Sequence, residues 1–290
     1  MKTKILFLGL VLSLLTISCT KDKADNSTIT ADEAGVNAKI DVANDDVSDI
    51  VETQFNATME NSTTGKSTEV ATTTYPIITR VPAFGTAPTV GQNVMKIIDF
   101  GTTGVVMPNG NILKGQIIIS FVYDPTATTH TINYQFNNFY HNSIKFDGSK
   151  TFTRTMTAAT ATSVAHPIVT MSMDMTATFP DGRVFTRVGT RTREITAGYD
   201  TPNVVADNVY QVTGSWTTTF PNTTEQTSTI TSPLIVKMSC AAVNKPLLVQ
   251  GIITFVRNTH TATLDYGNGD CDNLAIFTIN GVAYTIVIGN

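Results

Sequence analysis

The sequence has few charged residues, few cysteines and no long apolar run beyond its first residues. Only 14% of the 290 residues are charged, below the ~25% usual for soluble proteins, which excludes a chain kept disordered by its charge. Three cysteines exclude a small disulfide-dense scaffold and a multi-cysteine zinc fold. A pI near 5.5 argues against a nucleic-acid binder. No run after residue 15 approaches the ~18 apolar residues of a transmembrane helix.

Threonine is abundant instead, and it favours strands. About 50 residues are threonine, far above ordinary usage. From about residue 68 onward, alternating apolar and polar residues are separated by turn signals such as Asp147-Gly148 and Asn280-Gly281. The alternation is clearest at 131–136, 169–175 and 251–256. Because no helical period is long enough for a crossover, the sequence predicts an all-β fold, an antiparallel hairpin meander forming a sandwich or a half-open barrel.

The first residues have the features of a bacterial lipoprotein signal peptide. Two lysines precede an apolar run at 5–15, which is too short to span a ~30 Å hydrocarbon core as a helix. Ser18 and Cys19 follow, a small residue before a cysteine, as in a lipobox, whose cysteine is acylated after cleavage. We therefore predict a signal peptide over residues 1–18 and a lipid anchor at Cys19. An ordinary signal peptide that ends near a cysteine is the alternative.

The residues after the cysteine bear on localisation. Thr20 follows Cys19 in place of the aspartate that retains many lipoproteins in the inner membrane, which favours the bacterial outer membrane. The tail at 21–25 only partly resembles the export signals of surface lipoproteins, because Lys23 interrupts its acidic residues. The periplasmic and surface faces both remain open.

The acidity of the chain is concentrated near its N-terminus. Residues 20–60 carry ten acidic residues against three lysines, a net charge of −7, whereas residues 61–290 have a net charge of +1. We expect a flexible acidic tether over 19–40 and a single β-rich domain over 41–290. A short helix is expected at about 45–56, with Asn44 or Asp45 as its N-cap.

The β-rich domain has signs of internal duplication. The stretch 115–122 resembles 251–256, and each is followed by a His-Thr pair and a tyrosine. We therefore consider two related halves, at about 68–197 and 198–290. Coincidence in threonine-rich sequence is the alternative.

Several motifs together resemble a known family. The most specific is Leu264–Asn273 (LDYGNGDCDN), and Asn109-Gly110-Asn111 and Tyr210-x-Val212-Thr213-Gly214 accompany it. They are similar to a widespread group of uncharacterised, β-rich Bacteroidota lipoproteins, over roughly residues 40–290. Members often carry a further cysteine pair in the first half, which this chain lacks. The resemblance implies a fold and a location but no activity.

Two groups of residues near the C-terminus have structural or metal-binding potential. In an oxidising envelope, Cys240 and Cys271 are expected to form a disulfide. Asp265, Asp270 and Asp272 crowd oxygen atoms into a short stretch and are weak candidates for calcium ligands. Tight turns beside the disulfide would explain the same residues.

Four arginines form a candidate binding face. Arg183, Arg187, Arg191 and Arg193 are all odd-numbered within one expected strand, so they project from the same side. They could bind acidic sugars, lipid phosphate or the protein's own acidic arm. A solvated outer face is the alternative.

No catalytic motif accompanies these features, and the four histidines are scattered. We therefore expect no enzyme activity and no cofactor. The leading hypothesis is a structural or ligand-binding module of the envelope, with the membrane and a glycan or envelope protein as partners and no nucleic acid. One alternative is a half-barrel that carries lipid or lipoprotein, with Met171, Met173 and Met175 lining an apolar concavity. A cryptic hydrolase is the other.

Overall fold

The computed structural model describes residues 28–63, 75–161, 163–201 and 204–288. The expected signal peptide, Cys19 and the first part of the expected tether lie outside the described residues. Within the described ranges, one α-helix, α1 (Ala31–Thr63), precedes fourteen strands that belong to a single antiparallel sheet. None of the described helices is both long and apolar enough to cross a membrane.

The strands follow one another in sequence order, apart from β3, which pairs only with β4. Their bounds are β1 (Ile77–Val81), β2 (Asn93–Asp99), β3 (Val105–Val106), β4 (Ile112–Val122), β5 (Thr129–His141), β6 (Ile144–Met156), β7 (Pro167–Thr178), β8 (Val184–Ala197), β9 (Val209–Thr219), β10 (Glu225–Lys237), β11 (Leu248–Arg257), β12 (His260–Asn268), β13 (Leu274–Ile279) and β14 (Val282–Val287). Two short 3-10 helices, η1 (Val205–Asp207) and η2 (Met238–Val243), lie before β9 and after β10.

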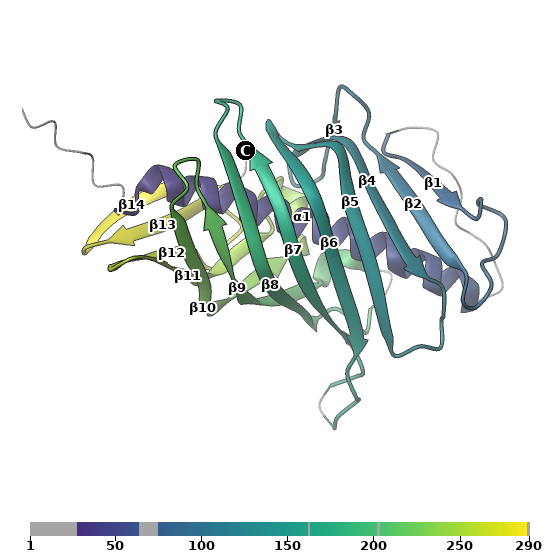
Figure 1. Ribbon diagram of the computed structural model, residues 1–290. Coiled ribbons are helices and arrows are strands. Elements are labelled where there is room, and N and C mark those ends of the chain that lie inside the picture. Colours follow the sequence, from purple (N-terminus) through teal and green to yellow (C-terminus); the bar gives the residue numbers. More distant parts are fainter. Residues whose placement is uncertain (1–27, 64–74, 162, 202–203, 289–290) are drawn as a thin grey trace, which may run out of the picture.

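The sheet is open and curves around α1, which runs along its concave side from β14 to β1 (Figure 1). The predicted all-β antiparallel meander is therefore confirmed. Of the two expected arrangements, the half-open barrel describes the molecule, because the sheet neither closes nor packs against a second sheet in the described ranges.

The period-two pattern of the sequence explains which side of the sheet faces the helix. In β7, Met171, Met173 and Met175 are buried. Thr170, which precedes them, and Ser172, which lies between the first two, are exposed. Such alternation is typical of antiparallel sheets with one face on a core and one in solvent. The apolar residues therefore line the concave face, and threonines cover the convex face.

The helix is much longer than the sequence led us to expect. It spans 33 residues rather than 45–56, and residues 31–40, which we assigned to the tether, are helical. Thr30 is its N-cap in place of Asn44 or Asp45: the Thr30 hydroxyl accepts from Glu33 N at 3.2 Å, and Thr30 N donates to the Glu33 carboxylate at 2.9 Å. This reciprocal capping box has a T-x-x-E signature that was readable in the sequence.

The burial of α1 explains why its length escaped the pattern of apolar residues. All nine residues from Ile40 to Ser48 are buried, and they include Asp41, Asp45 and Asp46. A surface helix shows one apolar stripe and one polar face. Here the sheet surrounds the helix, and the polar residues are buried along with the apolar ones.

The two hydrophobic clusters divide the sheet near the expected boundary of the halves. One contains buried side chains from β2 to β8 together with Phe220 after β9, and the other runs from Ile195 through β14; α1 contributes to both. Gly115 and Gly251, which match in the two repeats, both have positive φ at irregularities in strand pairing. A Cβ at either position would lie within 2.4 Å of a neighbouring backbone oxygen. Glycine is therefore required at both bulges.

One expected turn is wrong. Asp147 and Gly148 lie inside β6, and the hairpin between β5 and β6 turns instead at Asn142, which has φ of 54°. Gly148 has positive φ, and a Cβ there would lie 2.4 Å from Asp174 O of β7. The glycine is therefore needed because β6 and β7 approach each other closely at this point. In the sequence, an Asp-Gly pair inside a strand looks the same as one in a turn.

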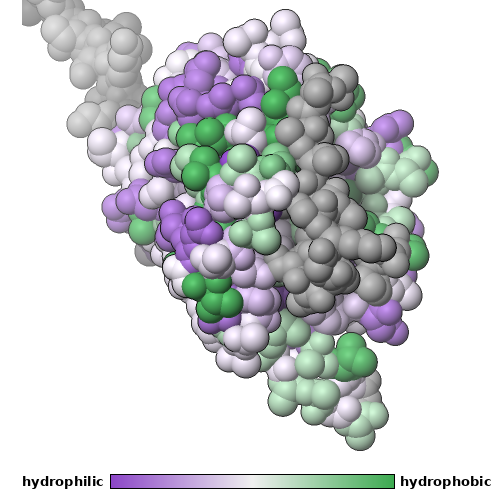
Figure 2. All heavy atoms as spheres, turned by 90° about the vertical axis from the view of Figure 1, so that its right-hand side faces the viewer, coloured by the Kyte–Doolittle hydropathy of each residue, from purple (hydrophilic) through white to green (hydrophobic). Residues whose placement is uncertain are grey.

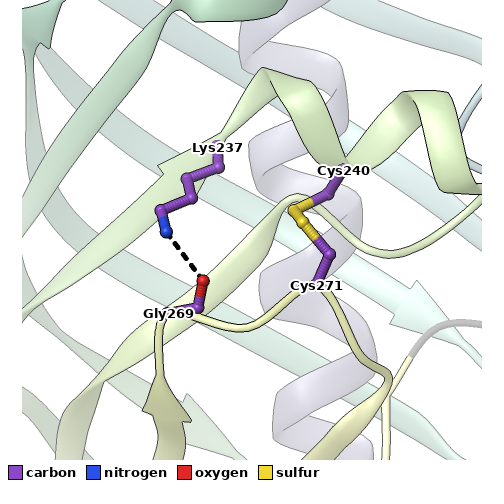
Figure 3. The surroundings of a disulfide bond; sticks show 4 residues. All are labelled: Lys237, Cys240, Gly269 and Cys271. Atoms are coloured by element: carbon purple, nitrogen blue, oxygen red, sulfur yellow. Dashed lines mark hydrogen bonds between the residues drawn. A yellow bond between two sulfur atoms is a disulfide. The ribbon is translucent and has the colours of Figure 1, made fainter.

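The expected disulfide joins Cys240 of η2 to Cys271 in the connection between β12 and β13 (Figure 3). Beside it, Lys237 Nζ donates to Gly269 O at 2.7 Å. The bridge thus holds η2, which packs near α1, to the sheet.

The bridge joins residues 31 positions apart in the sequence, and closing a loop of that length restricts the unfolded chain. We therefore expect the double variant Cys240→Ala/Cys271→Ala to lower the free energy of unfolding by about 3–4 kcal/mol. Urea unfolding of the oxidised wild type and the variant measures the difference. The reduced wild type is the control and should match the variant. Equal stability of all three would contradict the prediction.

Candidate functional site

The concave face of the sheet presents basic side chains to the acidic residues of α1. Arg187, Arg191 and Arg193 of β8 are all at most 6% exposed, and α1 passes directly over this strand (Figure 1). We call the buried charge network the set formed by these arginines and the helix carboxylates that face them. Those carboxylates are Asp41, Asp45, Asp49 and Glu52.

Asp41 is the centre of this network. One carboxylate oxygen of Asp41 accepts from Arg187 Nη1 at 2.6 Å and also contacts Arg191 Nη2. The other oxygen accepts from the Tyr266 hydroxyl of β12 at 3.0 Å. Asn37, one turn earlier, accepts from Arg187 Nη2 at 2.7 Å. A single helix position therefore holds two strands that lie far apart in the sequence.

Arg193 continues the network toward the C-terminal half of α1. Its Nη1 contacts Glu52 at 2.7 Å, and its Nη2 lies 3.6 Å from Asp49. Arg191 Nη1 lies 3.9 Å from Asp45. The arginines thus match carboxylates at successive turns of the helix.

A second polar cluster lies beside Asp46. Its carboxylate is 2.7 Å from His141 Nε2 at the end of β5, and it accepts from Asn109 and Asn111 side-chain amides at 2.8 Å each. All four side chains are buried. The Asn-Gly-Asn motif identified in the sequence therefore serves to bind the helix.

Basic residues outside β8 also contact α1. Lys96 Nζ of β2 donates to Gln54 O at 2.8 Å, Lys150 Nζ of β6 contacts Asn44, and Arg257 of β11 contacts Glu33 at 3.0 Å. These contacts extend from the first turn of the helix to near its end. The sheet therefore holds α1 by polar contacts along most of its length.

Aromatic rings support the arginines from the sheet side. The Arg191 and Arg187 guanidinium groups lie 4.1 and 5.0 Å from the Trp216 ring centre, and that of Arg193 lies 3.5 Å from Tyr210. Such stacking stabilises a desolvated guanidinium and fixes its plane. The only tryptophan is therefore a structural residue of the network.

Burial changes the acidity of several groups. Loss of solvation raises the pKa of Asp45 to about 6, although Arg191 and Arg193 oppose the change. Burial likewise raises the pKa of Asp49 to about 6, against the effect of Arg193. Burial, aided by the nearby arginines, holds the pKa of Lys150 well below its usual range. For Asp45 and Asp49, the loss of solvation therefore affects the pKa more than the attraction of the neighbouring arginines does.

The structure resolves the alternatives for the candidate arginine face. All four arginines contact the protein's own acidic segment, one of the three ligands we considered, and three of them are buried there. Arg183 precedes β8 and pairs at the surface with Asp181 at 2.7 Å and with Asp32 of α1. The face is therefore occupied, and it is not a solvated outer surface.

The open concavity expected of a lipid carrier is also occupied. Met171, Met173 and Met175 are buried in the same cluster as Val47 and Val51 of α1. A cavity of about 210 Å³ remains on one side of the helix, lined by Asp49, Glu52, Tyr199 and Tyr210 among others. These three methionines therefore pack against the helix, where a lipid carrier would present an open apolar concavity.

The weak calcium candidates form turns. The Asp265 carboxylate accepts from Gly267 N, and that of Asp272 accepts from Leu274 N, both at 2.9 Å. Asp270 O accepts from Asp272 N at 3.0 Å. Among the described residues, no group of three or more His, Cys, Asp or Glu side chains is placed to hold a metal ion.

The convex face carries a feature that sequence reasoning missed. Strand pairing aligns one residue from each of ten consecutive paired strands, β4 to β13, into a line that we call the hydroxyl row. It consists of Ser120, Asn133, Thr151, Ser172, Thr190, Ser215, Thr229, Thr254, Thr263 and Thr278. Nine of the ten carry a hydroxyl, none is charged and none is buried. At a strand spacing of ~4.8 Å, the row is about 43 Å long.

A second line of threonines runs beside the first over β5 to β9. It consists of Thr131, Thr153, Thr170, Thr192 and Thr213. Only the register of the strands aligns these residues, and register is not visible in a sequence whose strands are all rich in threonine.

Comparison with known proteins gave no match: no family model, no curated protein and no solved structure is significantly similar to the chain.

We expect Asp41→Ala to lower the free energy of unfolding by about 3–5 kcal/mol, because it leaves two buried arginines without their shared partner. The matched control is Asp32→Ala, which removes an exposed partner of Arg183 and should change stability by less than about 1 kcal/mol. Chemical denaturation of the three proteins tests this. Similar losses for both variants would contradict the assigned role of Asp41.

The raised pKa values predict how stability depends on pH. Because the pKa of Asp45 and Asp49 is higher in the folded chain than in the unfolded chain, the folded state binds more protons between about pH 4 and 6. The contribution of these groups to the free energy of unfolding therefore rises as pH falls through that window. We expect Asp45→Asn to remove up to about 3 kcal/mol of this rise.

Urea unfolding at pH 4.5 and 7.5 measures the effect as the wild-type-minus-variant difference, in which other titrating groups cancel. Asp174→Asn, which removes an exposed carboxylate from the convex face, is the control. A difference that does not change with pH for Asp45→Asn would count against a protonated, desolvated carboxyl.

Proposed function

We propose that this chain is a lipid-anchored module of the bacterial envelope that acts by binding rather than by catalysis, with its convex sheet face as the binding surface. The observation that carries the proposal is the hydroxyl row. It offers donors and acceptors of hydrogen bonds at regular spacing, in a line of uncharged side chains across ten strands.

Such a surface suits a neutral polymer with its own regular hydroxyl groups, that is, a polysaccharide. Threonine side chains lose little freedom on binding because their χ1 angle is already restricted. Some hydroxyls bond to one another, as Thr231 and Thr254 do at 2.9 Å, so the surface is ordered before a ligand arrives. The concave face cannot serve this purpose, because α1 occupies it.

Attachment at Cys19 supports the same role. Eight residues lie between Cys19 and Thr28, and the nine Cα–Cα steps that join these two residues span at most about 32 Å when fully extended. The body would therefore lie close to the membrane, where envelope polysaccharides are within reach. Outer-membrane attachment through acyl chains at Cys19 is part of the proposal.

We expect the mature protein to bind at least one insoluble neutral polysaccharide in a panel of glucans, mannans and xylans, and to bind alginate, a charged control, less. The triple variant Thr190→Val/Ser215→Ala/Thr229→Val removes three adjacent hydroxyls and keeps similar shapes. Its affinity should fall at least tenfold, since each hydrogen bond contributes about 0.5–1.5 kcal/mol.

The matched control is Thr176→Val/Thr186→Val/Thr219→Val, which changes three paired convex-face residues outside the hydroxyl row. Its affinity should stay within twofold of wild type. Absence of binding to every polysaccharide, or equal losses for both triple variants, would refute the assigned surface.

A further inference from the structure

The C-terminal hairpin is unusual among the described parts of the surface. From Leu274 to Ile288 the chain has no charged residue. Five large apolar side chains of this hairpin are between 40% and 55% exposed: Leu274, Ile276, Val282, Tyr284 and Val287. Single exposed apolar residues are ordinary, but a group of them on one protruding element points to an interaction site.

The two edges of the sheet are treated differently. Both edge strands are short, but β1 contains Arg80 and is flanked by Pro76 and Pro82, and charged residues and prolines are common protections against unwanted pairing. The other edge strand, β14, pairs with no described strand except β13 and has neither a charged residue nor a proline. At the β1 end, the residues not drawn in grey show hydrophilic and hydrophobic groups interspersed (Figure 2). The lack of any charged residue or proline therefore distinguishes the exposed edge at β14 from the edge at β1.

The position of this hairpin indicates what it contacts. The N-terminal end of α1 lies against β14 (Figure 1). A Cβ built on Gly35 of the helix would lie 3.8 Å from Ile286 Cγ2. Ile29, just before the helix, shares a hydrophobic cluster with Ile286 and Ile288. The chain therefore enters the described structure at the same end of the molecule as the hairpin. The chain between this point and Cys19 reaches at most about 32 Å.

We propose that the β13–β14 hairpin inserts its apolar side chains into the lipid surface to which the protein is anchored. This inference rests on the lipid anchoring proposed above. Val282 follows the turn at the tip of the hairpin, and Tyr284 lies two residues further along β14. Such side chains suit the boundary between acyl chains and headgroups, and the hairpin carries no charge that would oppose insertion. A second contact of this kind fixes the orientation of a body that a single point of attachment leaves free to rotate.

The test uses tryptophan reporters in the mature, acylated protein reconstituted into phosphatidylcholine vesicles with brominated acyl chains. Tyr284→Trp places a reporter on the hairpin, and Val188→Trp, 53% exposed at the centre of the convex face, is the matched control. The native Trp216 is buried and gives a constant background. We expect brominated lipid to reduce the added emission of Tyr284→Trp at least twofold and to leave that of Val188→Trp unchanged.

Equal, weak quenching of both reporters in vesicle-bound protein would overturn the hairpin contact while leaving the anchor intact. Pairing of β14 between two copies, seen as a dimer with an unquenched Tyr284→Trp reporter, would overturn it as well. The same reporters in a Cys19→Ala chain mixed with excess vesicles separate the two proposals. Selective quenching of Tyr284→Trp there supports the hairpin contact without any acyl chain, and its absence in both preparations refutes the contact.

Discussion

The whole structure depends on pairing charges that are withdrawn from water. Isolated buried carboxylates and guanidinium groups are too costly to desolvate, so each must face a partner of opposite charge or a hydrogen-bonding group. The arginines of β8 and the acids of α1 meet this requirement together. Neither element would be stable in its observed place without the other. The long helix is thus an internal part of a β-rich protein.

This pairing also determines the shape of the molecule. A helix of 33 residues is about 50 Å long, and a sheet that must cover it along most of that length cannot close into a compact barrel. The strands cross the helix one after another, and each contributes inward residues to the core. Their outward residues then form lines parallel to the helix, which is how the hydroxyl row arises. The binding surface we propose is in this sense a consequence of wrapping a sheet around a charged helix.

The sequence was sufficient for the meander, its alternating strands and the Cys240–Cys271 bridge, because these depend on local patterns and on the number of cysteines. It was insufficient to predict the extent of α1, although the capping-box pattern of Thr30 and Glu33 marks where the helix begins. The reason is physical: methods based on an apolar stripe assume that one side of a helix faces water, and Asp41 and Asp45 are buried here. The arginine spacing correctly placed Arg187, Arg191 and Arg193 on one face, but only the fold shows that this face points inward. The hydroxyl row depends on the register of nine strand pairs, which threonine-rich strands do not encode in any one segment.

The two ends of the helix give the molecule a direction. The end near Thr30 lies beside an uncharged hairpin, and the other end lies near β1, an edge strand with a charged residue and flanking prolines. If the chain is anchored ahead of Thr28, α1 begins close to the lipid surface and leads away from it. The hydroxyl row would then also run outward from β13, near the membrane, to β4, far from it. A polymer bound along the row would be held along the membrane normal rather than flat against the lipid. The proposed membrane contact of the β13–β14 hairpin would impose such an orientation on a body with a rigid internal helix, whereas a single point of attachment would not, because it leaves the body free to rotate.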